Sequence, residues 1–181
     1  MSTSSGSPPS AWKLSTDVYL GLGGNLGDPP ATFRHALNHL AEHAQIIGVS
    51  KLYRSKPYGF SDQPDFYNAA TRISTDLDPL DLLARLQDIE QKLGKKVVRE
   101  NGPRIIDLDL LLYGDETLDL PDLQLPHPGI LLRDFVLRPL HDLNPQLAHH
   151  SWQGKSLDSA LADLGESYLI EDSGVLEKTF L

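Results

Sequence analysis

Residues 17–43 read DVYLGLGGNLGDPPATFRHALNHLAEH, a strand pattern followed directly by a helix pattern. The opening DVYLGLG alternates and is rich in β-forming residues, which is typical of a strand. After a glycine-rich loop, Asp28 and Pro29 form a helix start, because aspartate caps the first free N–H groups and proline is tolerated at the first helical position. We therefore predict a strand, a tight turn and a helix that runs to about His43.

The same helix start recurs further along the chain. Residues 46–55 and 66–75 have strand patterns, and a loop with prolines and a glycine separates them. Asp78 and Pro79 repeat the capping signature, and Gly94 marks the end of the helix that follows. Apolar residues recur along one face of this helix: Leu82, Leu83, Leu86, Ile89 and Leu93.

Residues 104–113, RIIDLDLLLY, supply a fourth strand. The order β-α-β-β-α-β is the split βαβ arrangement of ferredoxin-like folds. We therefore predict an α+β protein whose mainly antiparallel sheet has two helices packed on one side. C-terminal additions are expected after this core: short strands within 118–125, a helical turn at 130–133 and a short helix at 158–164.

The composition is typical of one globular domain. The chain has 181 residues, 40% of them hydrophobic, and no run approaches the roughly 20 apolar residues that a membrane-spanning helix needs. Residues 1–14 begin with Ser, Pro and Gly and lack a secretory pattern, so we expect a disordered leader, with residues 15–181 as a single domain. The absence of cysteine excludes disulfides and thiolate metal sites and makes a cytoplasmic location our expectation.

The formal net charge of −9 argues against a nucleic-acid-binding protein, whose affinity comes largely from basic residues that meet phosphates. The charge is nevertheless uneven, because a basic cluster precedes two aspartates: Lys92, Lys95, Lys96, Arg99 and Arg104. This cluster indicates an anionic ligand. The alternative is a solvated helix end, where cations interact favourably with the helix dipole.

Asp107 and Asp109 carry the strongest chemical signal. Side chains alternate along a strand, so both aspartates are expected on one face. That face would also hold Ile105, Leu111 and Tyr113, and the core face Ile106, Leu108, Leu110 and Leu112. Unpaired carboxylates among apolar residues are unfavourable, and oxygen ligands without His or Cys favour Mg²⁺ over zinc. The alternative is an open sheet face that leaves both carboxylates exposed.

Two further residues flank this strand. Arg104 stands at its start and suits a phosphate, because its guanidinium group binds two oxygens at once. Strict alternation points Arg104 away from Asp107 unless the strand begins later, and the alternative role is an ordinary ion pair. His127 lies between two prolines, which indicates a rigid backbone that fixes the position of its side chain. The alternative is a structural role, which is more common for a lone histidine.

Three familiar motifs fail in this chain. The loop at residues 21–27 has leucine where G-x-G-x-x-G requires glycine or alanine, and the GKS at 154–156 lacks the earlier glycine of a P-loop. His35, His39 and His43 recur every four residues without the acidic partner of an HExxH zinc site, so we interpret them as an amphipathic flank.

Four motifs follow one another in order: LGGNLG at 22–27, YRS at 53–55 with DQPDFYNA at 62–69, GPRIIDLDLLLY at 102–113, and PHP at 126–128 with RDFVL at 133–137. Together they resemble the hydroxymethyldihydropterin pyrophosphokinase family. The resemblance runs from about residue 18 to residue 147, and four ordered motifs are far more specific than any one of them.

The resemblance implies that ATP donates its β,γ-diphosphate to 6-hydroxymethyl-7,8-dihydropterin and leaves AMP, in folate biosynthesis. It implies that Asp107 and Asp109 hold two Mg²⁺ ions and that Lys95 and Arg104 act with them in catalysis. The implied ATP contacts are Gln87, Glu90, Lys95, Arg104, Leu110, His127 and Arg133. The implied pterin contacts are Ser55, Pro57, Tyr58, Phe66, Asn68 and Phe135. We expect a monomer, with no nucleic-acid or membrane partner.

Four positions depart from the family's pattern. Gly24 stands where serine is usual, Lys95 and Val97 where arginines are common, and Asn101 where tryptophan is common. Lysine does not bind two oxygens as arginine does, so we expect an altered closing step of the mobile loop before the acidic strand. Arg99 could take the place of the second arginine from a shifted register.

Three other functions share parts of these features. A non-catalytic ferredoxin-like sensing module would bind ATP without consuming it and needs no paired carboxylates. An RNA-recognition module has the same element order but requires aromatic and basic residues on the face of the sheet, where Asp107 and Asp109 are expected here. Another Mg²⁺-dependent phosphotransferase would release ADP in place of AMP.

Overall fold

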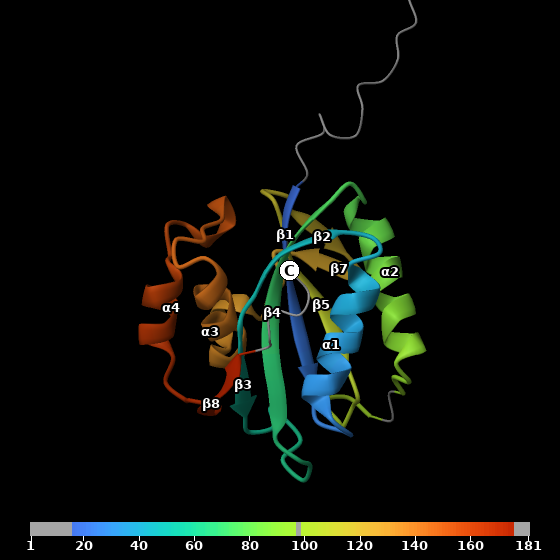
Figure 1. Cartoon of the computed structure of the whole chain (residues 1–181). Coiled ribbons are helices and arrows are strands. Elements are labelled where there is room, and N and C mark those ends of the chain that lie inside the picture. Colours follow the sequence, from blue (N-terminus) through green and yellow to red (C-terminus); the bar gives the residue numbers. More distant parts are fainter. Residues whose placement is uncertain (1–15, 97–98, 176–181) are drawn as a thin grey trace, which may run out of the picture.

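The computed structural model describes residues 16–96 and 99–175, so the expected leader and Val97 lie outside the described residues. The sheet has six strands in the order β5-β1-β4-β3-β8, with β2 also paired to β4 (Figure 1). The strands are β1 (Thr16–Gly24), β2 (Gln45–Val49), β3 (Lys51–Ser55), β4 (Phe66–Thr75), β5 (Asp107–Tyr113) and β8 (Leu169–Val175). All pairings are antiparallel, and the predicted βαββαβ core is confirmed.

The single strand predicted at 46–55 is wrong in one respect, because Ser50 divides it into β2 and β3. The N–H of Ser50 donates to the carbonyl of Ala70 at 2.9 Å, as in a normal ladder. The N–H of Ala70, however, donates to the hydroxyl oxygen of Ser50 at 2.8 Å, where a backbone carbonyl would ordinarily accept. A side chain thus replaces one backbone group of the ladder and interrupts the strand.

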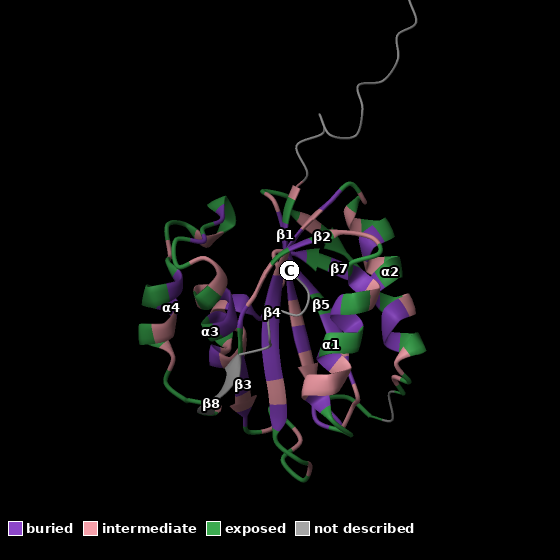
Figure 2. Ribbon diagram, viewed as in Figure 1, coloured by how far each residue is buried: buried purple, intermediate pink, exposed green. Residues whose placement is uncertain are grey.

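The two predicted helices are present as α1 (Pro29–Leu40) and α2 (Pro79–Lys92), both capped as expected. Asp28 accepts from the N–H of Ala31 at 3.2 Å, and Asp78 accepts from the N–H of Asp81 at 2.9 Å. Both helices pack on one face of the sheet, and their inward sides and the central strands are buried (Figure 2). The main core on this face includes Leu20, Leu22, Phe33, Leu37, Ile73, Leu82, Leu86 and Ile89.

The expectation that helices cover only one side of the sheet is wrong. A helix that the sequence did not predict, α3 (Asp134–Leu143), and the short α4 (Leu157–Asp163) cover the second face (Figure 1). The second face is itself apolar there, and its buried cluster is Tyr19, Ala70, Leu111, Leu112, Ile130, Leu137, Leu140, Leu147, Leu157 and Ala160. Apolar side chains on both faces of a sheet require cover on both faces.

Strict alternation also fails at the end of β5. Tyr19 pairs with Leu112 whereas its neighbour Leu20 pairs with Leu110, so Leu111 is the extra residue of a β-bulge. Leu111 and Leu112 therefore both belong to the second-face cluster, and Tyr113 returns to the main core. The predicted faces of Leu112 and Tyr113 were the reverse, while those of Asp107 to Leu111 are as expected.

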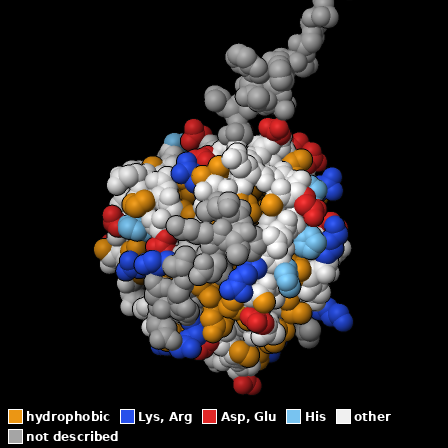
Figure 3. Space-filling model, in the orientation of Figure 1, with side chains coloured by type: hydrophobic (Ala, Val, Ile, Leu, Met, Phe, Trp, Pro, Cys, Tyr) orange, Lys and Arg blue, Asp and Glu red, His pale blue; other side chains and the backbone are white. Residues whose placement is uncertain are grey.

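The predicted short elements after the core are present. They are β6 (Leu118–Leu120), β7 (Leu123–Leu125), a 3₁₀ turn at Ile130–Leu132 and α4, with a further 3₁₀ turn at His150–Trp152. The tail does more than add Leu157 and Trp152 to the second-face cluster, because β8 extends the sheet beside β3. Among the described residues, no helix has the length and apolar character to span a membrane. Acidic and basic side chains are interspersed on the face shown in Figure 3.

Candidate active site

Two rows of paired residues run across the middle of the sheet. Gly23 of β1 pairs with Asn68 of β4 on one side and with Asp107 of β5 on the other. Residues paired in this way point to the same face, with neighbouring strands about 4.8 Å apart. In the next row, Gly21 lies between Ala70 and Asp109. The glycines carry no side chains, so a trough separates the amide of Asn68 from the two carboxylates.

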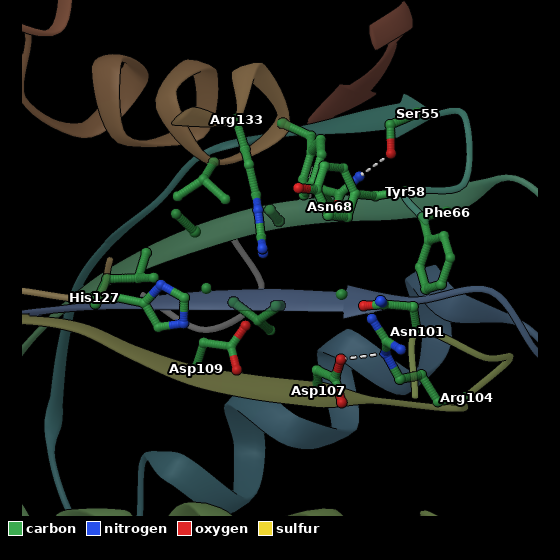
Figure 4. A pocket seen from close by; sticks show the side chains of 18 of the residues that line it. Ser55, Tyr58, Phe66, Asn68, Asn101, Arg104, Asp107, Asp109, His127 and Arg133 are labelled. Atoms are coloured by element: carbon green, nitrogen blue, oxygen red, sulfur yellow. Dashed lines mark hydrogen bonds and ion pairs between the residues drawn. The ribbon is translucent and has the colours of Figure 1, made fainter. Parts of the chain in front are cut away.

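This trough is the floor of a pocket on the second face of the sheet, where the N-terminus of α3 also contributes (Figure 4). Most of the predicted site residues line it: Ser55, Tyr58, Phe66, Asn68, Arg104, Asp107, Asp109, His127, Arg133 and Phe135. Pro57 does not line the pocket but lies between Lys56 and Tyr58, which do. The structure therefore brings together residues from β3, β4, β5 and the segments around them.

Asp107 lies between two cations. Its Oδ1 is 2.7 Å from Nζ of Lys95, and its Oδ2 forms an ion pair with Nε of Arg104. Arg104 reaches Asp107 because β5 begins only at Asp107, so the arginine is free of the strand's alternation. This contact required the strand to begin after Arg104, and β5 does begin after it, at Asp107.

The first loop positions Arg104 through Asn25, which is 6% exposed. Oδ1 of Asn25 accepts from the N–H of Arg104 at 2.9 Å, and Nδ2 donates to Gln63 and to the carbonyl of Pro64, both at 2.9 Å. The expected tight turn after β1 thus also ties the loop at 60–65 to the start of the acidic strand.

Glu90 of α2 joins Lys95 to the sheet. Its Oε2 accepts from the N–H of Leu108 at 2.9 Å and from Nζ of Lys95 at 2.8 Å. Desolvation lowers the pKa of Lys95, but the hydrogen bonds to Asp107 and Glu90 outweigh it and raise the pKa above its usual value. Lys95 is therefore a charged ammonium group held between two carboxylates.

Asp109 has no hydrogen bond or ion pair among the described residues. Its side chain is exposed to the solvent of a concave pocket and is at the same time surrounded by protein. Desolvation, followed by the negative charges of Asp107 and Glu90, raises the pKa of Asp109 to about 6. A cation at this carboxylate would relieve both effects.

The opposite wall of the pocket offers an oriented amide and aromatic rings. Nδ2 of Asn68 donates to Oγ of Ser55 at 2.8 Å, and both residues are buried. This bond turns Oδ1 of Asn68 toward the pocket, where it can accept from a ligand (Figure 4). Phe66, Tyr58 and Phe135 line the pocket around it.

His127 and Arg133 close the pocket at its other end. The N–H of His127 donates to the carbonyl of Leu111 at 2.9 Å, and Nδ1 accepts from the N–H of Gly129 at 3.0 Å. Burial, with the charge of Arg133, lowers the pKa of His127. The imidazole is thus neutral near pH 7 with its proton on Nε2. The guanidinium group of Arg133 lies 4.5 Å from the ring centre of Tyr58.

Four of the expected ATP contacts do not line this pocket: Gln87, Glu90, Lys95 and Leu110. Leu110 is buried in the main core and lines a neighbouring concavity together with Leu83, Asp109, Gln124 and His127. Gln87 is exposed on α2 and lines neither concavity. Glu90, one helical turn from Gln87, faces Lys95 instead, so the structure does not bring these two side chains to one place.

The described part of the basic loop packs against the loop after β3. The guanidinium group of Arg99 lies 3.7 Å from the ring centre of Phe60, and Nε2 of Gln63 donates to the carbonyls of Phe60 and Asn101 at 2.6 Å each. Asn101 lines the main pocket with a left-handed backbone, φ 55°. Asn101 therefore lines the main pocket, whereas Arg99 lines a separate concavity together with Phe60 and Asn101.

The donor set fits a hard cation. Asp107 and Asp109 offer carboxylate oxygens to one pocket, and oxygen is what Mg²⁺ prefers. Within residues 16–96 and 99–175, no group of three or more His, Cys, Asp or Glu side chains could hold a metal ion. A cation here would need its remaining ligands from water and from a bound anion.

Some pocket residues were not predicted from the sequence. Gly21 and Gly23 were assigned to the end of the first strand and its turn without a role in the site, although glycine inside a strand is a known sign of close approach by a ligand or another chain segment. Ala70 and Val136 line the pocket without any local signal, because neither residue carries a chemical group that a sequence pattern would single out.

The fold and the site define a ferredoxin-like α+β protein whose pocket combines paired carboxylates, cations and an oriented amide. Residues 19–145 match the family profile of the 7,8-dihydro-6-hydroxymethylpterin-pyrophosphokinases (HPPK). The chain belongs to this family.

Individual proteins agree with the family match. A 2-amino-4-hydroxy-6-hydroxymethyldihydropteridine pyrophosphokinase of Pseudomonas aeruginosa is 45% identical over 132 residues, which are 72% of this chain and 82% of that protein. The folic acid synthesis protein fol1 of Pneumocystis carinii is 43% identical over 133 residues, 73% of this chain but only 18% of that protein. The chain thus spans a small part of such longer relatives.

Solved structures support the fold. The HPPK-DHPS of Plasmodium falciparum, crystallised with pteroate, has a TM-score of 0.66 and 17% sequence identity, and the match covers 82% of this chain and 42% of that chain. At this identity the similarity shows the fold alone.

Proposed function

We propose that this chain is a pyrophosphokinase of folate biosynthesis, which transfers the β,γ-diphosphate of ATP to the hydroxymethyl oxygen of 6-hydroxymethyl-7,8-dihydropterin. The oxygen attacks the β-phosphorus and loses its proton, the bond between the α,β-bridging oxygen and that phosphorus breaks, and AMP leaves with the bridging oxygen. The observation that carries the proposal is the register that places Asn68 and Asp107 on either side of Gly23. One pocket can therefore bind a planar heterocycle through the amide of Asn68 and hold the reacting end of that heterocycle near the carboxylates.

The pterin is held by the wall opposite the carboxylates. Oδ1 of Asn68 accepts from an N–H of the pterin's amide edge, because the bond to Ser55 occupies its other end. The rings of Phe66 and Phe135 contact the flat faces of the heterocycle, with Tyr58 beside them. A heterocycle held in this way has one orientation, which is most of what phosphoryl transfer requires of the acceptor site.

The phosphates are held by the cationic side of the pocket. Lys95, Arg104 and Arg133 bind phosphate oxygens, and Nε2–H of His127 donates a hydrogen bond to them. The neighbouring concavity, partly lined by Leu83 and Leu110, accepts the nucleoside. The role of Gln87 as an ATP contact remains a prediction and requires its side chain to turn toward that concavity.

Asp107 and Asp109 would hold two Mg²⁺ ions together with the triphosphate. The ions would supply charge stabilisation at the phosphates and at the departing oxygen. Asp107 would then exchange its contacts with Lys95 and Arg104 for the cation, and these two side chains would become available to the phosphates. The catalytic role of Lys95 and Arg104 follows from this exchange.

Three further parts of the proposal concern the whole molecule. Residues 15–181 act as one domain, which is supported by both hydrophobic clusters packing on the same sheet. The protein works as a monomer, for which one copy of the chain supplies both the carboxylates and the aromatic wall of the pocket. It works in the cytoplasm, where the reaction finds its ATP, without a nucleic-acid or membrane partner.

The test is incubation of purified protein with Mg-ATP and 6-hydroxymethyl-7,8-dihydropterin, with the nucleotide products resolved by chromatography. AMP is expected only when pterin and Mg²⁺ are both present, and AMP release should be lost in Asp107→Asn. The matched control is Asp76→Asn, an exposed aspartate in the turn before α2, which should behave as wild type.

The rival functions give different products. Release of ADP would replace the proposal with a phosphotransferase that has another acceptor chemistry. ATP binding without turnover would favour the sensing module.

A further inference from the structure

We infer that the C-terminal segment completes the pterin side of the pocket, with Tyr168 as a positioning residue for Tyr58 and Phe135. The inference rests on the proposed function, because it concerns the same pocket. Tyr168 does not line the pocket, so it acts through the two rings that do.

Three aromatic rings form a closed cluster. The ring centre of Tyr168 is 5.4 Å from that of Tyr58 and 5.9 Å from that of Phe135, and Tyr58 and Phe135 are 6.2 Å apart. These separations and the tilted or edge-on orientations are those of favourable aromatic pairs. Tyr58 is 40% exposed on an irregular segment, so the contact with Tyr168 limits where its ring can lie.

The backbone of Tyr168 is anchored by the residue next to Phe135. Asp134, 7% exposed, accepts three hydrogen bonds at Oδ2: from the hydroxyl of Ser167 at 3.0 Å, from the N–H of Tyr168 at 2.9 Å and from the N–H of Leu169 at 3.1 Å. A buried carboxylate with several N–H donors is a strong anchor. The start of α3 and the tail are thus held together.

The same backbone is tied to the other pocket wall. The N–H of Lys56 donates to the carbonyl of Tyr168 at 2.8 Å, and Ser55 pairs with Leu169 at the start of β8. Tyr168 therefore links the segment that carries Ser55 and Tyr58 to the segment that carries Phe135. Through Tyr58 it also reaches Arg133, whose guanidinium group stacks on that ring.

The family match ends at residue 145, so the contact comes from a part of the chain outside the matched region. Tail residues that hold pocket side chains set the affinity for the acceptor without touching the reacting atoms. The acceptor is a planar aromatic heterocycle. Its binding depends strongly on where the rings of Tyr58 and Phe135 lie.

The experiment compares pterin binding and turnover in the full chain. Tyr168→Ala is expected to raise the Kd and the KM for 6-hydroxymethyl-7,8-dihydropterin about threefold to tenfold, the range of one aromatic pair. The value of kcat should stay close to wild type. Tyr168→Phe keeps the ring and should restore affinity, and Ile170→Ala, an exposed residue of β8, should leave Kd unchanged.

A double-variant cycle distinguishes positioning from an independent contact. In Tyr58→Ala/Tyr168→Ala the loss of affinity should be smaller than the product of the two single losses, because Tyr168 acts partly through Tyr58. Fully multiplicative losses would overturn the positioning role. Thermal melts accompany each variant, and Tyr168→Leu, which keeps apolar bulk without a ring, is measured if Tyr168→Ala unfolds.

Failure of the inference differs from failure of the proposed function. A wild-type protein that binds pterin but releases no AMP overturns the proposed function alone. Equal pterin affinities for wild type, Tyr168→Ala and Tyr168→Leu overturn the inference alone. A wild-type protein that binds no pterin overturns both.

Discussion

Nζ of Lys95 lies 2.7 Å from Oδ1 of Asp107, so a lysine of the basic loop neutralises the first carboxylate of the site. The same ammonium group lies 2.8 Å from Oε2 of Glu90. Lys95 is one of the positions where arginine was expected from the resemblance, and its compact ammonium group fits between two carboxylates. These contacts therefore fix the ammonium group of Lys95 in the site and keep a positive charge beside the carboxylates, where phosphates would bind.

Replacing Lys95 by methionine should lower AMP release about 10²-fold or more, the scale observed when one charge-stabilising donor is removed from an active site. Lys95→Arg keeps the charge and adds a second donor, so it should remain active with a changed turnover rate; unchanged turnover would contradict the altered closing step expected from the lysine. Steady-state AMP formation with pterin and Mg-ATP measures this. Lys92→Met, at an exposed ion pair with Asp88, is the matched control, and equal rates for both methionine variants would contradict the role of Lys95.

Asp109→Asn should stabilise the metal-free protein at pH 8. The pKa of Asp109 is raised from 3.8 to about 6 in the folded state, so the charged form destabilises the fold above that pH. The gain should be about 1 kcal/mol or less, since the side chain is exposed to solvent. The gain should shrink as the pH falls from about 6 toward 3.8, and it should vanish below 3.8, where the carboxyl is neutral in the folded and the unfolded state alike. Urea unfolding in the presence of a chelator at several pH values measures it; a difference that grows toward low pH would contradict the sign.

Ser55→Ala should weaken pterin binding about tenfold and change kcat less, because the amide of Asn68 loses the partner that orients it. Ser55→Thr keeps the hydroxyl acceptor and should behave almost as wild type. The KM for the pterin and its Kd by calorimetry report the effect. The prediction would be refuted by an alanine variant that loses kcat while its pterin KM is normal.

Gly23→Val and Gly24→Ala should separate function from folding. A Cβ at Gly23 would lie 3.7 Å from Oδ1 of Asn68, an ordinary van der Waals contact, so the fold should tolerate a side chain there, but the methyl groups of valine would fill the trough and abolish pterin binding. A Cβ at Gly24 would clash with the carbonyl oxygen of Ile105, so Gly24→Ala should cost about 1–3 kcal/mol of stability. Calorimetric pterin titration and thermal melts distinguish the two; a destabilised Gly23→Val that still binds pterin would reverse the assignment.

Much of the fold could be predicted because its signals are local. Asp28 and Asp78 cap the helices that follow them, and period-two alternation marks the strands. The helix α3 gave no such signal, since Pro139 lies inside it and Arg133 at its N-cap position makes no side-chain capping bond. Burial of Leu137 and Leu140 stabilises α3 instead, and that burial depends on the sheet beneath.

The candidate site was predictable to a similar extent. Asp107 and Asp109 stand out because they interrupt an apolar strand, and Asn68 belongs to a motif. The contact of Arg104 with Asp107 depended on where β5 begins, which pairing with β1 decides. Tyr168 could not be found in advance, because nothing near it in the chain indicates the rings it meets.

The sequence alone determined the order of elements in the βαββαβ core, the acidic pair, the basic cluster and the family. The tertiary structure alone decided that Gly23 separates Asn68 from Asp107, that Leu111 forms a bulge and that β8 brings Tyr168 to Tyr58. The physical reason is the separation along the chain over which each interaction acts. Capping, alternation and turn preferences act over a few neighbouring residues, whereas register, bulges and cross-chain contacts depend on how segments far apart in sequence pair and pack.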